Sequence, residues 1–100
     1  MALDVATFLL GYPEFSDAPP SLIQAKLTDA IALVPPVVWG NADPSRDLVQ
    51  QGVFLYAAHF LACSPFARDM KLVHDDGKTT LYSDRLATLK RLVASGARVL

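Results

Sequence analysis

Apolar positions recur at helical spacing along most of the chain, and prolines and glycines divide this pattern into segments. The first segment is short. Asp4 is a favourable N-cap for a helix that carries Val5 and Phe8 on one face. Gly11 suits the left-handed residue that ends many helices, and Pro13 prevents the helix from continuing. We therefore predict a short helix that begins after the aspartate and ends at the glycine.

Two large aromatic residues lie in the break that follows, within the stretch FLLGYPEFSD over residues 8–17. A connection between helices is normally polar and exposed, so aromatic side chains at this place need another explanation. We expect Tyr12 and Phe15 to fold back and to pack the first helix against the second. This corner is therefore predicted to be structural, with no ligand bound to it.

The second segment carries an apolar stripe with the period of an amphipathic helix. Its start is open between residues 17–20, which place proline in the first turn, and a capping box from Ser21 to Gln24. Pro35-Pro36 is expected to end the helix. The stripe consists of Leu22, Ile23, Leu27, Ala30, Ile31 and Val34.

The middle of the chain holds a short apolar segment and then the longest apolar run. Residues 37–40 (VVWG) are predicted to be extended or to form a turn, with Trp39 as a core or interface anchor. Asp43-Pro44 is a cap followed by a first-turn proline, and it predicts a third helix that runs to about Ser64. Residues 52–63 (GVFLYAAHFLAC) are apolar nearly all round, so this helix should be central.

The last third changes character. Asp76-Gly77 between two short β-prone runs predicts a β-hairpin within residues 66–82. Ser83 or Asp84 is expected to cap a last helix that ends near Gly96. Its predicted inward positions are Leu86, Leu89, Leu92 and Val93. The predicted fold is mainly α: a small bundle of about four helices with one short β-hairpin before the last helix, in a single domain over residues 1–100.

Charge is unevenly distributed along the chain, although the net charge of −1 argues against a strongly basic nucleic-acid binder. Residues 1–67 carry six acids and two bases, whereas residues 68–100 carry seven bases and four acids. The basic third could face an acidic partner or a phosphate backbone, or its charges could simply be solvated. Its candidate partner-contact residues are Arg85, Lys90, Arg91 and Arg98.

Candidate chemistry is sparse. His59 and Cys63 share a helix face, but zinc sites usually need about four ligands, and the other histidine, His74, lies on the predicted hairpin. A hydrogen-bonded core histidine and a packed cysteine are favoured over catalysis or metal binding. A turn accounts for Asp75-Asp76 better than a calcium site does. We predict no catalytic residue, no cofactor and no metal.

Composition restricts the setting in which the protein works. Cys63 is the only cysteine, so an intramolecular disulfide is impossible and a reducing compartment is indicated. No stretch reaches the roughly 18–20 apolar residues of a membrane span, and a signal peptide is not expected. Apolar residues make up 52% of the chain, which hints at surface buried against partners.

Three short motifs in order resemble a family of tailed-phage head–tail adaptors, also called head-completion or connector proteins. A phenylalanine precedes Pro-Glu-Phe, an amphipathic helix and Trp-Gly follow, and then a helix with an Ala-His core. The matching residues, which span about 8–62, are Phe8, Pro13, Glu14, Phe15, Trp39, Gly40, Tyr56, Ala58, His59 and Leu61. The family often carries a serine- and glycine-rich segment after the His-containing helix, which this chain replaces with the basic third.

The resemblance implies a structural function without catalysis. Copies would form a ring, commonly of twelve, between the portal protein and the next neck or tail component, and would extend the DNA channel without recognising sequence. The protein would be part of the virion and would assemble in the host cytoplasm. One alternative is a small helical regulatory or DNA-associated protein that uses the basic third. Another is an enzyme or metal protein that uses His59 and Cys63.

Overall fold

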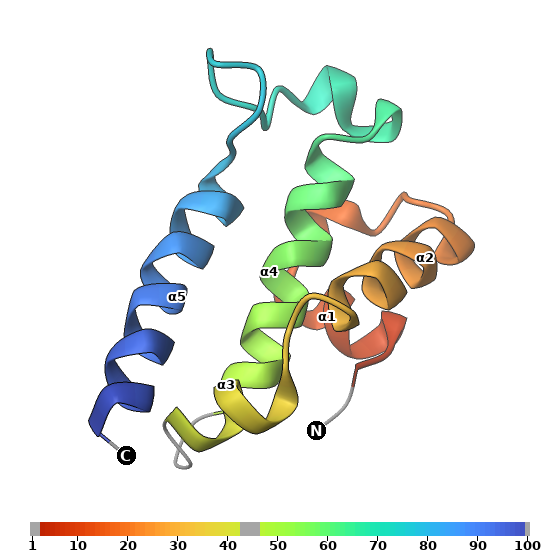
Figure 1. The fold of residues 1–100 in the computed structure, drawn as a ribbon. Helices are drawn as coiled ribbons and strands as arrows, with labels where there is room; N and C mark the ends of the chain where they lie inside the picture. The colour runs from red at the N-terminus through yellow and green to blue at the C-terminus, as the bar shows by residue number, and fades with distance from the viewer. Residues whose placement is uncertain (1–2, 43–46, 100) are drawn as a thin grey trace.

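The computed structural model describes the backbone of residues 3–42 and 47–99 and the side chains of residues 3–39 and 47–94. The chain is mainly helical, as the periodicity predicts (Figure 1). Its elements in order are α1 (Val5–Gly11), the 3₁₀ helix η1 (Pro13–Phe15), α2 (Pro20–Ile31), α3 (Pro36–Ala42), α4 (Leu48–Ala62), the 3₁₀ helix η2 (Pro65–Met70) and α5 (Leu81–Val99).

Helix α4 occupies the middle of the bundle (Figure 1). It packs against α2 on one side and α5 on the other, while α3 contacts both α4 and α5. Buried positions occur all round α4, because Leu48, Val49, Ala57 and Ala58 point in different directions from the helix axis and are all buried. The prediction of a central helix is therefore confirmed for residues 52–62, whereas Cys63, which was predicted to be packed, follows the helix and is exposed.

The start of the chain follows its prediction, except at the glycine. Asp4 caps α1 by accepting a hydrogen bond from the backbone N–H of Thr7 at 2.7 Å. Gly11 is the last residue of the helix, but it is not left-handed: only Lys71 and Gly77 have positive φ among the described residues. The break comes instead from Pro13, which opens η1.

Residues 37–40, predicted to be extended or to form a turn, are helical and belong to α3. Pro36 stands at the first helical position, where a missing N–H does no harm, and the Trp39 N–H donates to the carbonyl of Pro35 at 3.1 Å. Trp39 is buried, as predicted. Its ring lies on Gly52 of α4, where a Cβ atom would stand 2.3 Å from Trp39 Cζ3.

Of the two predicted starts of the second helix, the structure has the one within residues 17–20: α2 begins at Pro20, with proline in its first turn. The alternative capping box from Ser21 is not formed, and Gln24 donates instead to Thr28 Oγ1 (3.4 Å). Helix α4 is capped by Asp47, which accepts from the Gln50 N–H at 3.1 Å. The predicted start signal Asp43-Pro44 lies outside the described residues.

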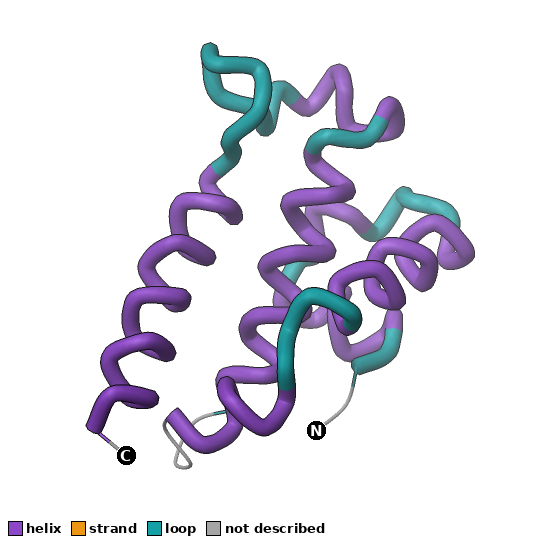
Figure 2. Tube along the Cα trace, in the orientation of Figure 1, coloured by secondary structure: helices purple, strands orange, loops and turns teal. Residues whose placement is uncertain are grey.

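The predicted β-hairpin is wrong, since residues 66–80 contain η2 and a turn but no strand (Figure 2). One antiparallel bridge joins Val73 to Thr80. Asp76 forms the turn by accepting from the backbone N–H groups of Lys78 and Thr79, both at 2.9 Å. A longer strand cannot form because Thr80 is already the N-cap of α5, which begins at Leu81.

Helix α5 is capped by Thr80, before the predicted caps Ser83 and Asp84, and it continues past its predicted end. Thr80 and Ser83 form a reciprocal cap, in which the Thr80 N–H donates to Ser83 Oγ (2.8 Å) and the Ser83 N–H to Thr80 Oγ1 (3.1 Å). The helix then runs through Gly96 to Val99. A glycine alone does not end a helix, although it weakens one.

Candidate interaction surfaces

Five aromatic rings join the N-terminal corner to α4 and α5. The Phe8 ring stacks on Tyr12 with centroids 4.9 Å apart, and it meets Phe54 of α4 edge-on at 5.4 Å. Phe15 and Tyr12 each lie 5.8 Å from the ring of Tyr82 at the start of α5. Phe8 and Phe15 are fully buried. The expectation that Tyr12 and Phe15 pack the first helices together is confirmed, and α5 is part of the same cluster.

A hydrogen bond completes this cluster. The Tyr82 hydroxyl donates to Glu14 Oε2 at 2.5 Å, across 68 positions of sequence. Burial raises the pKa of Tyr82 above its ordinary value, and the bond to the Glu14 carboxylate raises this pKa further. Glu14 of the Pro-Glu-Phe motif therefore holds the N-terminal corner against α5.

The candidate histidine also serves the fold. His59 Nδ1 lies 3.0 Å from Thr80 Oγ1, so α4 is hydrogen-bonded to the cap of α5. Cys63 Sγ is 3.9 Å from both ring nitrogens. Burial lowers the pKa of His59 and raises the pKa of the Cys63 thiol, which favours the neutral form of each and disfavours a thiolate–imidazolium pair. No three metal-ligating side chains converge within the described residues.

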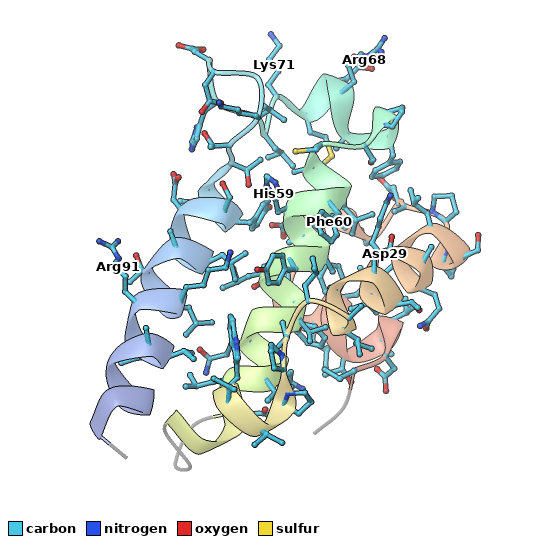
Figure 3. The ribbon with its side chains drawn as sticks, viewed as in Figure 1. Asp29, His59, Phe60, Arg68, Lys71 and Arg91 are labelled. Carbon is cyan, nitrogen blue, oxygen red and sulfur yellow. The ribbon has the colours of Figure 1, made fainter. Side chains whose placement is uncertain are left out.

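The predicted basic contact residues lie along α5, and they differ in what they touch. Lys90 places its Nζ 5.0 Å from the centroid of the Tyr56 ring, which engages it in a cation–π contact within the chain. Arg85 and Arg91 are exposed, and Figure 3 shows Arg91 pointing away from the bundle. Arg91 Nη2 lies 3.5 Å from Thr88 Oγ1. The side chain of Arg98 lies outside the described residues.

A shallow groove of about 440 Å³ runs along the seam between α4 and α5. Leucine side chains form its apolar part, and polar or charged side chains complete its lining. The lining residues are Gln51, Leu55, Arg85, Thr88, Leu89 and Leu92. Leu92, predicted to be inward, is 38% exposed because it lies at this groove. The groove offers an apolar strip beside a guanidinium group.

A second exposed apolar surface is the segment that joins α2 to α3, which we call the 31–38 corner. Its eight residues, IALVPPVV, include no polar or charged side chain. Only Val34 is buried, whereas Leu33 is 48% and Val37 75% exposed. Ile31, predicted to face inward, is also exposed. Exposed apolar patches of this kind commonly mark interaction sites.

A further hollow, of about 540 Å³, lies between the end of α4, η2 and the following turn. Arg68, Lys71 and Asp75 line it beside Cys63. Arg68 and Lys71 are exposed and lie at the end of the bundle where η2 and the turn meet (Figure 3). Its charges are of both signs, so the hollow selects no ligand class.

Sequence reasoning did not identify the 31–38 corner or the groove. The corner had a signal: eight consecutive apolar residues across a Pro-Pro break cannot all turn inward, because a connection runs over the surface. The groove had no such signal in the sequence. Leu55 and Leu92 belong to different helices, and a local sequence pattern does not define how two helices lie relative to each other.

Comparison of the chain with known protein families, curated proteins and solved structures finds no match. None of the described helices combines the length and the sustained hydropathy that crossing a membrane requires.

Proposed function

We propose that this chain is a structural protein of a tailed-phage particle. In this proposal it is a head–tail connector whose copies form a ring, of about twelve members in the related family, between the portal protein and the next neck or tail component. The ring extends the DNA channel, and the protein has no catalytic activity. It assembles in the host cytoplasm and remains in the virion.

The observation that carries the proposal is the ordered set of motifs and the packing of their residues. Phe8 and Phe15 belong to the buried aromatic cluster, and Glu14 bonds to Tyr82 of α5. Trp39 packs on Gly52, and His59 is hydrogen-bonded to Thr80. Each of these motif residues thus helps to assemble the fold, as expected of a family whose motifs define a scaffold and not an active site.

Two surface properties also support a role in assembly. The 31–38 corner and the α4–α5 groove expose apolar side chains that a protein working alone would gain by burying. The net charge of −1 suits a channel component that lets DNA pass, because tight binding to phosphates needs an excess of bases.

Binding to portal-containing particles tests this function. The purified chain should sediment saturably with phage heads that carry their portal and not with heads that lack it. Heads assembled without the protein should lose DNA or fail to accept tails. Normal tailed virions in the absence of the protein would refute the proposal.

The alternative is a small DNA-associated protein, which the excess of bases in residues 68–100 favours. It predicts a salt-dependent shift of a DNA fragment in an electrophoretic assay. The shift should disappear in the triple variant Arg85→Glu, Lys90→Glu, Arg91→Glu. Binding that survives this charge reversal would exclude Arg85, Lys90 and Arg91 as the DNA-binding residues.

A further inference from the structure

We infer that the α4–α5 groove of one copy receives the 31–38 corner of a second copy, so that the protein associates head to tail. This inference rests on the proposed function insofar as it identifies the surfaces by which neighbours in the ring meet. The association itself can be measured on the purified chain, without any phage component.

The corner has the properties of an inserted element. Its exposed residues Leu33, Val37 and Val38 project from a segment without polar side chains, so burying it leaves no side-chain hydrogen bond unmade. Pro35 and Pro36 restrict the backbone between the two helices. A restricted segment loses little conformational entropy on binding, which favours affinity.

The groove has the properties of a receiving element. Leu55 of α4 and Leu89 of α5 line the groove and are buried, whereas Leu92 beside them is 38% exposed and available to a partner. With about 440 Å³ the groove can hold a few aliphatic side chains, but no large aromatic assembly. The groove is also lined by the polar side chains of Gln51 and Thr88. Polar residues beside an apolar centre are typical of the rim of a protein–protein interface.

Charge complementarity favours a second copy as the occupant. Helix α2, which leads into the corner, carries one acidic side chain, Asp29, and one basic one, Lys26. Residues 81–94 of α5, beside the groove, carry three basic side chains and one acidic one, Asp84, which pairs with His74 at 2.8 Å. Asp29 is an exposed acid two residues before the corner (Figure 3), and it can meet the exposed guanidinium groups of Arg85 and Arg91 beside the groove of the next copy.

The corner and the groove share no residue, which determines the kind of assembly. A contact between two different surfaces leaves one corner and one groove free in every dimer, so association continues until the chain of copies closes into a ring. An interface between two identical patches would stop at a dimer.

Single variants of the two surfaces test the inference by sedimentation velocity over a range of concentrations. Val37→Asp in the corner and Leu92→Asp in the groove should each raise the dissociation constant by roughly 30-fold or more. Thr88→Tyr is a second groove variant, which fills the groove from an exposed position and does not disturb the core. Leu10→Asp is the matched control, since Leu10 is 86% exposed and lies outside both surfaces; it should associate like the wild type.

The decisive experiment is to mix a corner variant with a groove variant. A corner variant and a groove variant each keep one intact surface, so an equimolar mixture should form a heterodimer, with Thr88→Tyr or Leu92→Asp contributing the corner. Higher salt should weaken wild-type association several-fold, because it screens the charges beside the interface.

The inference is overturned if the wild type stays monomeric, if Val37→Asp associates normally, or if the mixture stays monomeric while the wild type assembles. Normal association of both groove variants would point to a corner-to-corner contact and would also refute it. If head-to-tail association is found but portal-containing heads do not bind the chain, the proposed function fails and this inference stands. If the chain binds to heads but its mixtures stay monomeric, the proposed function stands and this inference fails.

Discussion

Two proline-containing corners join the helices of the N-terminal half. The large apolar side chain of the first is buried, whereas most of those of the second are exposed to solvent. Residues 12–19 connect α1 to α2 and place Phe15 fully inside the protein. Residues 32–35 connect α2 to α3 and leave Leu33 about half exposed, while Val37 follows at 75% exposure. Both corners carry large apolar side chains and both contain prolines.

The difference lies in what each corner faces. The first corner meets α4 and α5: the Tyr12 ring lies edge-on to Phe54, and both Tyr12 and Phe15 contact the ring of Tyr82. The second includes only one residue that reaches the core, Val34. Apolar composition in a connection therefore has two meanings: it stabilises the fold where other elements cover it, and it offers a binding surface where none does.

The largest effect is expected from truncating the buried corner. Phe15→Ala should lower the free energy of unfolding by about 3–5 kcal/mol, because it removes a fully buried ring that packs on Phe8 and Tyr82 and leaves a cavity. Urea denaturation followed by circular dichroism measures this change. Leu10→Ala is the control, since its side chain is 86% exposed, and it should stay within about 0.5 kcal/mol of wild type. An equally small change in Phe15→Ala would contradict the assignment of this corner to the core.

The contact between α3 and α4 should be the next most sensitive. Gly52→Ala places a Cβ atom 2.3 Å from Trp39 Cζ3, so the indole must move, and the change should cost about 1–3 kcal/mol. The single tryptophan reports this movement by a shift of its fluorescence. Gly11→Ala is the matched control, because a Cβ there meets no atom within 4 Å. If the two alanine variants behaved alike, the close packing of Trp39 on Gly52 would be refuted.

These contacts show where sequence reasoning succeeds and where it stops. Asp4, Pro13 and the long apolar run of α4 act through their own neighbours, so the helices and the central position of α4 were predictable. The contact of Trp39 with Gly52 depends on how α3 packs across α4. The local sequence pattern does not predict this packing geometry. For the same reason residues 37–40 looked extended by composition, although packing makes them helical.

A smaller effect is expected from the hydrogen bond that holds the first corner to α5. Tyr82→Phe keeps the ring but removes the bond to Glu14, and it should cost about 1 kcal/mol at neutral pH. The pKa of Tyr82 is raised in the folded state, so this residue contributes stability below the unfolded pKa of about 10, and the contribution is lost as pH rises above it. Unfolding between pH 8 and 11 should therefore show a weaker alkaline loss in the phenylalanine variant. An identical alkaline loss in both proteins would argue against this bond.

The smallest effect on stability concerns His59. Burial lowers its folded pKa, so its contribution is fully present above the unfolded pKa of about 6.5 and is lost as pH falls toward the folded value. The melting temperature of the wild type should drop between pH 7 and 5 by more than that of His59→Gln, which does not titrate. His74→Gln serves as the histidine control. If His59→Gln kept the full acid dependence, the assignment of this slope to His59 would be wrong.

The candidate surfaces were less predictable than the fold. Arg85, Lys90 and Arg91 were identified by charge, yet Lys90 stands over Tyr56, and this contact depends on the packing of α5 on α4. The prediction of a β-hairpin was wrong because Thr80 could either continue a strand or cap a helix. In the structure it forms a reciprocal cap with Ser83 at the start of α5. Local signals identify which residues can start a helix or turn, but the packed bundle decides which signal is used.

The measurement that tests the account most directly compares the two corners in one experiment. Sedimentation velocity and thermal unfolding are recorded for wild type, Val37→Asp and Phe15→Ala at matched concentrations. The account predicts that Val37→Asp melts within a few degrees of the wild-type monomer but no longer self-associates, whereas Phe15→Ala loses thermal stability. A Val37→Asp protein that assembles like the wild type would contradict the claim that the 31–38 corner is a binding surface.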